Sequence, residues 1–349
     1  MNVRRRLIPA AAVTAVTALA MGTLSACSSD SAAAGDTGKF DVVASFYPMA
    51  FLAEQIGGDH VNVTSLTQPG QEPHDLEISA KQTAQLEETD AALYLKGLQP
   101  TVDEAVAQSG VKTKIDAATL TTLETHGTEA GAHEDEHGHE DEHADEHSHE
   151  DEHGHEDEHG DEHAGEEEGH SHATEGGEDP HVWLDPVKYA EVAEGVGKAF
   201  EKADPDHAAD YKKNTEALVG RLNELDTTFE TGLKGRTSDV FITTHSAFGY
   251  LAERYGLTQE AINGLSPEAE PSAARVKELA ETAKADGVTT VFYETLVSDD
   301  TAKTVAADAG LKTDVLDPLE GITDTSRGDD YFEVMESNLK ALRTALGAA

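Results

Sequence analysis

The sequence predicts an α/β protein of two lobes, each built on a mostly parallel sheet. Short runs rich in β-branched residues alternate with amphipathic stretches of helical periodicity, a pattern typical of repeated strand–helix–strand units. The chain has 349 residues. About 250 of them have an ordinary globular composition, which is enough for two lobes of normal size.

The expected strands lie at 42–46, 61–67, 91–95, 240–244, 289–293 and 313–316. Ligands of such folds bind beyond the carboxyl ends of the strands, so the residues that follow these segments are candidates for a site. Two helix starts are marked by Asp185-Pro186 and Asp204-Pro205, because an acidic N-cap precedes a proline at the first helical position.

A long helix is expected after Pro205. One apolar stripe runs along it at steps of seven, four, three and four residues, formed by Tyr211, Leu218, Leu222, Leu225 and Phe229. The helix should end near Gly232 or Gly235. We interpret it as a rigid connector between the lobes; an ordinary helix packed within one lobe is the alternative.

The N-terminus has the pattern of an export signal. A basic start at residues 1–6 is followed by an uncharged apolar run, residues 7–21, that is shorter than the roughly 20 residues a transmembrane anchor needs. The run ends at Leu24-Ser25-Ala26-Cys27, which resembles a lipobox, and Cys27 is the only cysteine. Lipidation of Cys27 would tether the mature protein, without disulfides, to the outer face of the cell membrane.

These features divide the chain into five parts. We expect a signal peptide at 1–26, a lipidated tether at 27–39, an N-terminal α/β lobe at 40–205, a linker helix at 206–235 and a C-terminal α/β lobe at 236–349.

A histidine-rich acidic segment interrupts the first lobe between Glu124 and Asp179. It holds 13 of the 18 histidines and 24 acidic residues, and it has no Lys, Arg, Leu, Ile, Val, Met or aromatic residue. Residues 133–148 are repeated almost unchanged at 149–164. Such a composition cannot form a core, so we expect a disordered loop that holds several divalent metal ions weakly. A solvated acidic linker is the alternative.

The charge of the chain excludes one class of partner. The net charge is −44, of which −24 falls in the histidine-rich segment; elsewhere 45 acidic residues face 25 basic ones. A surface this acidic repels phosphate and attracts cations. Nucleic acid is therefore not an expected partner.

Three histidines outside the segment stand in unusual surroundings. His74 lies in the run EPHDLE after an expected strand, His181 in DPHVWLDP, and His245 directly after the strand 240–244. Each taken alone could be an ordinary structural histidine. The two remaining histidines, His60 and His207, lie beside aspartates in turn-like contexts and are interpreted as surface residues.

These runs, with THSAFGYLAERYGL around His245 and the ending LDPLEGITDTSRGDDYFEVMESNL, resemble the metal-binding lipoproteins of zinc and manganese ABC importers, in particular the zinc-specific branch. The resemblance covers nearly all of the chain from Phe40 on. It implies two α/β lobes joined by a long helix, a monomer, and one metal ion held between the lobes as transported cargo. The implied partners are a membrane permease and its ATPase.

The resemblance also implies a ligand set of His74, His181, His245 and Asp324. Glu72, Asp329 and Asp330 remain possible substitutes for Asp324, and water fills that position in some members. Three imidazoles with one carboxylate suit tetrahedral zinc, whereas manganese prefers more oxygen.

We therefore expect a zinc-binding transport protein and not an enzyme, since four protein ligands leave no water to activate and no HExxH motif occurs outside the histidine-rich segment. A manganese-binding member of the family, or a zinc buffer or adhesin without a transport role, are the alternatives.

Overall fold

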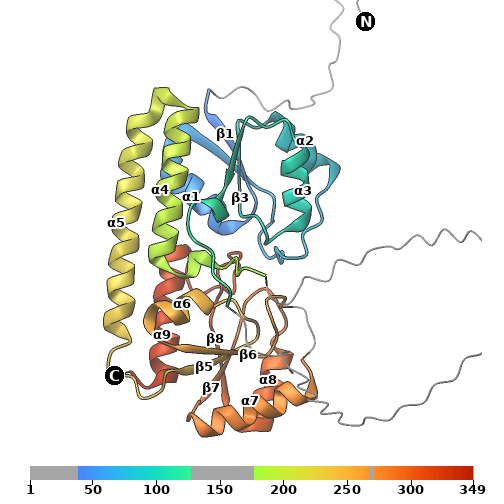
Figure 1. The fold of residues 1–349 in the computed structure, drawn as a ribbon, viewed down its shortest axis with the longest axis vertical. Helices are drawn as coiled ribbons and strands as arrows, with labels where there is room; N and C mark the ends of the chain where they lie inside the picture. The colour runs from blue at the N-terminus through green and yellow to red at the C-terminus, as the bar shows by residue number, and fades with distance from the viewer. Residues whose placement is uncertain (1–37, 127–176, 268–270, 349) are drawn as a thin grey trace, which may run out of the picture. The chain divides into compact units, whose positions relative to one another are not determined.

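The structure is a computed structural model that describes residues 38–126, 177–267 and 271–348. Its described part contains two separate four-stranded sheets in which every strand pairing is parallel. The strand orders are equivalent, β2-β1-β3-β4 and β6-β5-β7-β8 (Figure 1). The prediction of two parallel α/β lobes is confirmed.

The first sheet comprises β1 (Phe40–Ala44), β2 (Val61–Ser65), β3 (Ala91–Tyr94) and β4 (Thr113–Asp116). One face is covered by α1 (Tyr47–Gly57) and α4 (Pro186–Ala203), backed by α5 (Ala208–Gly232); the other is covered by α2 (Ala80–Glu88) and α3 (Pro100–Gln108) (Figure 1). Successive residues of β1 divide between the faces: Val42 joins the main core, whereas Val43 packs in a separate cluster with Leu86 and Val102. Both faces of this sheet are therefore buried.

The second sheet repeats this plan with β5 (Val240–Thr243), β6 (Thr258–Ala261), β7 (Thr290–Tyr293) and β8 (Lys312–Val315). Its helices are α6 (Gly249–Tyr255), α7 (Ala273–Ala285), α8 (Asp300–Ala309) and α9 (Tyr331–Leu346). Ile242 and Val291 pack with residues of α7 and α8, whereas Phe241 and Phe292 join the main core with α6 and α9.

The long helix α5 connects the two halves of the main core. It spans 25 residues, and all five residues of the predicted stripe are buried. It packs against α1 and α4 of the first half and α9 of the second. One continuous core cluster runs from Phe40 to Leu346. The α5 helix is thus packed along its length, which supports a rigid connection.

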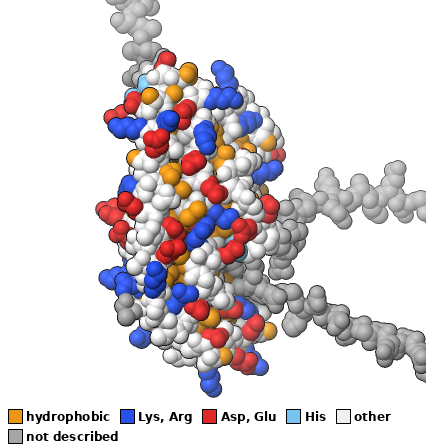
Figure 2. Space-filling view, turned by 60° about the vertical axis from the view of Figure 1, so that its left-hand side comes forward, with side chains coloured by type: hydrophobic (Ala, Val, Ile, Leu, Met, Phe, Trp, Pro, Cys, Tyr) orange, Lys and Arg blue, Asp and Glu red, His pale blue; other side chains and the backbone are white. Residues whose placement is uncertain are grey.

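The outer face of α4 and α5 is solvated. Figure 2 turns this side forward and shows acidic and basic side chains interspersed over it. The residues of α5 between its buried positions are largely charged or polar and exposed. This face therefore forms the polar side of an amphipathic pair of helices.

Two strands were not predicted from the sequence. β4 (TKID) and β6 (TQEA) each form one edge of a sheet, and only one residue of each is buried. Neither segment has the run of β-branched and large apolar residues by which the six predicted strands were found, although β2 and β8 also have only one buried residue each. The predicted strands themselves are matched to within a few residues at their ends.

Several predictions concern residues outside the described ranges. They are the signal peptide at 1–26, the lipidation of Cys27, nearly all of the tether and residues 127–176 of the histidine-rich loop. The loop was expected to be disordered from 124 to 179, but the structure describes its two ends, residues 124–126 and 177–179. The backbone amide of Asp179 donates to the carbonyl of Glu124 at 2.8 Å and joins these ends. No helix in the described ranges is long and apolar enough to cross a membrane.

Candidate metal centre

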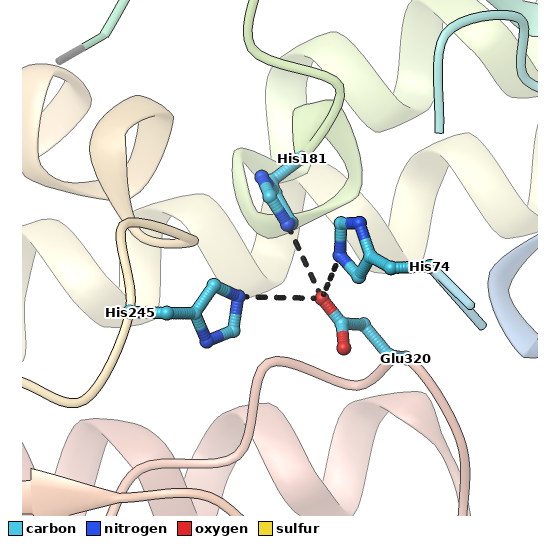
Figure 3. Close-up of side chains that lie close together, drawn as sticks. All are labelled: His74, His181, His245 and Glu320. Carbon is cyan, nitrogen blue, oxygen red and sulfur yellow. Dashed lines mark hydrogen bonds and ion pairs between the residues drawn. The ribbon is translucent and has the colours of Figure 1, made fainter. Parts of the chain in front are cut away.

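Three of the predicted histidines converge on one buried acid. The donor atoms of His74, His181, His245 and Glu320 all lie within 4.8 Å of one another (Figure 3). His74 lies in the loop after β2, His245 follows β5, and Glu320 follows β8, so three of the four come from the carboxyl ends of parallel strands. His181 directly precedes the short 3-10 helix Val182–Leu184.

The distances within this group are those of a small coordination shell. Glu320 Oε1 lies 3.1 Å from His74 Nε2, 3.2 Å from His181 Nε2 and 3.5 Å from His245 Nε2. In a zinc tetrahedron with bonds of roughly 2.0–2.2 Å, neighbouring ligand atoms are about 3.3–3.6 Å apart. The three nitrogen–oxygen separations are therefore close to the edges of such a tetrahedron.

Two buried acids orient the imidazole rings. Asp179 Oδ1 lies 2.7 Å from His181 Nδ1, and Glu294 Oε1 lies 2.8 Å from His245 Nδ1. When Nδ1–H donates to a carboxylate, the lone pair of Nε2 is left to face the centre. The Asp179 oxygen also accepts the backbone N–H of His181 at 2.9 Å. These contacts hold two of the three rings in the tautomer that a metal requires.

His181, His245 and Glu320 are fully buried, His74 is partly exposed, and the charges of the four residues interact. Burial disfavours the charged form of His181 and by itself would lower its pKa. Attraction to Asp179 and Glu320 outweighs this effect and raises the pKa of His181. Attraction to Glu294 and Glu320 raises the pKa of His245 well above its ordinary range. Burial alone would raise the pKa of Glu320, but attraction to His74 and hydrogen bonds from His181 and His245 hold it well below its usual range. These shifts favour protonated His181 and His245 beside an ionised Glu320 when no metal is bound.

Unpartnered polar atoms at the centre support a cation there. Among the described residues, His245 Nε2 and Glu320 Oε2 are buried and have no hydrogen-bond partner. Buried polar groups are nearly always paired, and a metal ion at the centre would engage the free nitrogen. Glu72 is close by, and burial together with Glu320 raises its pKa to about 8. This shift favours the protonated form of Glu72, which reduces the negative charge that it adds to the centre.

The expected fourth ligand, Asp324, is not in this group. Its side chain is exposed, whereas Glu320, four residues earlier, is fully buried among the three imidazoles. The considered substitutes Asp329 and Asp330 lie at the start of α9, where Asp330 accepts the backbone N–H of Glu333 as its N-cap. The structure thus places Glu320 where Asp324 was expected.

The local backbone explains why Glu320 was overlooked. Leu319 has a φ of 59°, the only positive value at a non-glycine position in the described ranges. At this turn after β8, the side chain of the next residue, Glu320, is buried in the centre. Trp183 Nε1 holds the turn by donating to the carbonyl of Pro318 at 2.7 Å. The position of Glu320 five residues after the end of β8 was the available clue.

Further bonds hold the halves of the centre together. Tyr331 at the start of α9 donates its hydroxyl to the carbonyl of Trp183 at 2.7 Å. Arg254 of α6 contacts both carboxylate oxygens of Asp185, at 2.9 Å from Nε, while Asp185 also caps α4. The residues next to His181 are therefore fixed to elements of the second sheet.

The two histidines interpreted as surface residues lie elsewhere. His60 pairs with Asp210 and His207 with Asp204, and the two rings stack with centroids 4.1 Å apart. Neither histidine is part of the buried group.

Three imidazoles and a carboxylate, enclosed by two parallel α/β lobes, define a metal-binding protein of the two-lobed, helix-linked class. The model of one family, described as zinc-uptake complex component A, periplasmic (ZnuA), matches residues 42–345. The chain belongs to this family, as its resemblance to the metal-binding components of ABC importers indicated.

Two curated relatives illustrate the similarity. The zinc-binding lipoprotein AdcA of Streptococcus pneumoniae is 36% identical over 326 residues, which is 92% of this chain and 58% of the relative. The chain therefore spans a little over half the length of that protein. The high-affinity zinc uptake system protein ZnuA of Bacillus subtilis is 35% identical over 314 residues, 88% of either chain.

Solved structures agree with the fold. The Zn(II)-bound ZnuA-like domain of S. pneumoniae AdcA superimposes with a TM-score of 0.65 at 33% identity, covering 88% of this chain and 99% of that domain. The similarity thus includes both lobes.

Proposed function

We propose that the protein captures one Zn²⁺ ion outside the cytoplasm and delivers it to an ABC-type permease and its ATPase. The observation that carries the proposal is the buried group in which three Nε2 atoms surround one oxygen of Glu320. Membership of a family described as a periplasmic zinc-uptake component supports the transport role, as do the names of the relatives, a zinc-binding lipoprotein and a zinc uptake system protein.

Zinc fits this donor set better than manganese. The group offers three nitrogen atoms and one carboxylate, and Mn²⁺ ranks lowest of the first-row divalent ions for such ligands. Bound Zn²⁺ would retain one net positive charge after pairing with Glu320. The nearby carboxylates of Asp179 and Glu294 are already hydrogen bonded to His181 and His245 and would offset that charge through the rings.

A binding role fits the centre better than catalysis. Catalytic zinc keeps a position open for water or substrate, whereas four protein ligands close a tetrahedral ion. His181, His245 and Glu320 are each at most 1% exposed. We infer that the protein is a carrier and not an enzyme.

The location follows from the N-terminal sequence. We infer that Cys27 is lipidated after export, and that the mature monomer is held at the outer face of the cell membrane, where it can meet a permease. The name lipoprotein borne by the S. pneumoniae relative supports this anchor. Mass spectrometry of the membrane fraction would detect the acyl chains, and Cys27→Ser should release the protein into the medium.

The metal assignment is tested by competition against a chelating indicator. The full chain after removal of the signal peptide should bind one Zn²⁺ much more tightly than any other zinc equivalent, and should prefer Zn²⁺ to Mn²⁺ by a large factor. Equal or tighter binding of Mn²⁺ would place the protein among the manganese carriers.

Delivery needs a cellular test. Cells that lack the protein should grow poorly under zinc chelation and recover with the wild-type chain but not with His245→Ala. Recovery with His245→Ala would indicate that the protein acts as a buffer or adhesin and that transport does not depend on this centre.

A further inference from the structure

A second group of metal-ligating side chains lies apart from the buried centre. Glu124, His126 and Glu253 place one donor atom each within 4.8 Å of the others. His126 Nε2 lies 2.9 Å from Glu253 Oε2 and 4.0 Å from Glu124 Oε2. Glu253 is on α6, whereas Glu124 and His126 precede residues 127–176 of the histidine-rich segment. We call these three residues the outer group, and His74, His181, His245 and Glu320 the inner group.

The ring of His126 is oriented in the same way as the rings of the inner group. Its Nδ1 lies 2.9 Å from Oδ2 of Asp179, whose side chain is fully buried. This contact leaves Nε2 as the nitrogen that faces the two glutamates. The other oxygen of Asp179 contacts Nδ1 of His181. A single carboxylate therefore orients one histidine of each group.

The fold leaves specific room for this imidazole. The ring of His126 lies against Tyr250, with centroids 4.3 Å apart. It also covers Gly249 so closely that a Cβ there would come within 2.4 Å of His126 Cβ. The side chain of His126 is only 17% exposed. It is thus seated in a cradle between α6 and Asp179, although it lies in a segment whose composition predicts disorder.

The charges of the outer group favour a cation. Two carboxylate oxygens face the same nitrogen, and the lysine near them, Lys188, contacts the other oxygen of Glu124 at 2.6 Å. Glu124 Oε2 and the carboxylate of Glu253, which is 60% exposed, remain available. A divalent ion would bridge the nitrogen and these oxygens, relieving the repulsion between the carboxylates.

We propose that His126, Glu253 and Glu124 form a second divalent-cation site that takes Zn²⁺ through one imidazole nitrogen and two carboxylate oxygens. It has one ligand fewer than the inner group and is partly open to water, so it binds Zn²⁺ more weakly. It is separate from the proposed carrier site, but shares Asp179 with it.

The test uses the full chain after removal of the signal peptide, labelled with ¹⁵N at histidine, and Zn²⁺ as the probe. His126→Ala identifies the imidazole signal of His126 by its loss. After the first equivalent of Zn²⁺ has filled the inner group, further Zn²⁺ should move the His126 Nε2 signal to a metal-bound value. Glu253→Gln should raise the zinc concentration at the midpoint of that change at least about tenfold.

His207→Ala is the matched control. Like His126, His207 is a partly exposed histidine whose Nδ1 contacts an aspartate, but within the described residues no carboxylate contacts its Nε2. It should leave the midpoint unchanged. A His126 signal that stays still while other histidines of the segment respond would overturn the proposal. So would a midpoint that does not depend on Glu253, since His126 would then act with the segment alone. The signals of His74, His181 and His245 are followed separately, so failure of the inner site would be distinguished from failure of the outer one.

Discussion

The inner and outer groups use the same means of orienting imidazole but differ in burial. In each, a carboxylate fixes Nδ1 and leaves Nε2 for a metal. Glu320 of the inner group is fully buried, whereas Glu253 of the outer group is 60% exposed. We expect the shared ring orientation to make both sites possible, and the number of ligands and their burial to determine how tightly each site holds its ion.

The first prediction removes one inner ligand. His245→Ala should weaken the tightest zinc equivalent by more than the roughly 10- to 100-fold that loss of a partner outside the ligand shell costs. The outer group does not contain His245, so its zinc binding should persist. Competition with a chelating indicator measures the first effect and the His126 imidazole signal the second. Unchanged tight binding would show that the inner group is not the carrier site.

The second prediction separates the two candidate acids. Glu320→Gln should weaken the tight site by at least about tenfold, because the anionic ligand is lost while the shape is kept. Asp324→Asn is the matched control at the exposed position and should leave affinity within about twofold, since surface changes of this kind have small effects. The reverse order of effects would restore Asp324 as the ligand.

The third prediction concerns the carboxylate shared by the two groups. Asp179→Asn and Glu294→Gln should each weaken inner zinc binding by about 10- to 100-fold, because each replaces the carboxylate that accepts an Nδ1–H by a neutral amide, which is a weaker acceptor. Only Asp179→Asn should also weaken the outer site. Equal effects of the two variants on the His126 signal would contradict the shared role of Asp179.

The fourth prediction is a pH dependence of the metal-free protein. The folded-state pKa values of His181 and His245 are raised above 6.5, so their stabilising contribution is full below about pH 6.5 and is lost as pH rises through the raised values. The raised pKa of Glu72, about 8, acts in the same direction. The Tm of metal-free protein should therefore fall from pH 6.5 to 8, less steeply in His245→Gln.

Zinc reverses this slope, because the ion binds only deprotonated imidazole. The gain in Tm on adding one equivalent of Zn²⁺ should grow over the same pH range. A metal-free Tm that rises from pH 6.5 to 8 would show that the inner histidines are not protonated in the folded protein.

The sequence predicted the elements with strong apolar patterns. The six strands with β-branched runs and the stripe of α5 were found because their residues face a core. The edge strands β4 and β6 were missed because their residues are mostly polar or partly exposed. Local pattern thus revealed the two central strands of each sheet and one of its edge strands, β2 or β8, but not the other edge strand.

Local sequence pattern also explains which residues of the inner and outer groups were predicted and which were missed. His74, His181 and His245 stood in distinctive runs, but Glu320 is brought inward by the positive φ of Leu319, which local pattern does not reveal. His126 was indistinguishable from the other 12 histidines of its segment. Its seat depends on contacts with Asp179 and Glu253, which are 53 and 127 residues away along the chain.

The most direct test of the carrier centre is anomalous diffraction at the zinc edge from crystals of the protein loaded with one equivalent of Zn²⁺. The strongest peak should lie at about 2.0–2.2 Å from Nε2 of His74, His181 and His245 and from a carboxylate oxygen of Glu320. A strongest peak bonded to Asp324, or one that lies away from these histidines, would contradict the account.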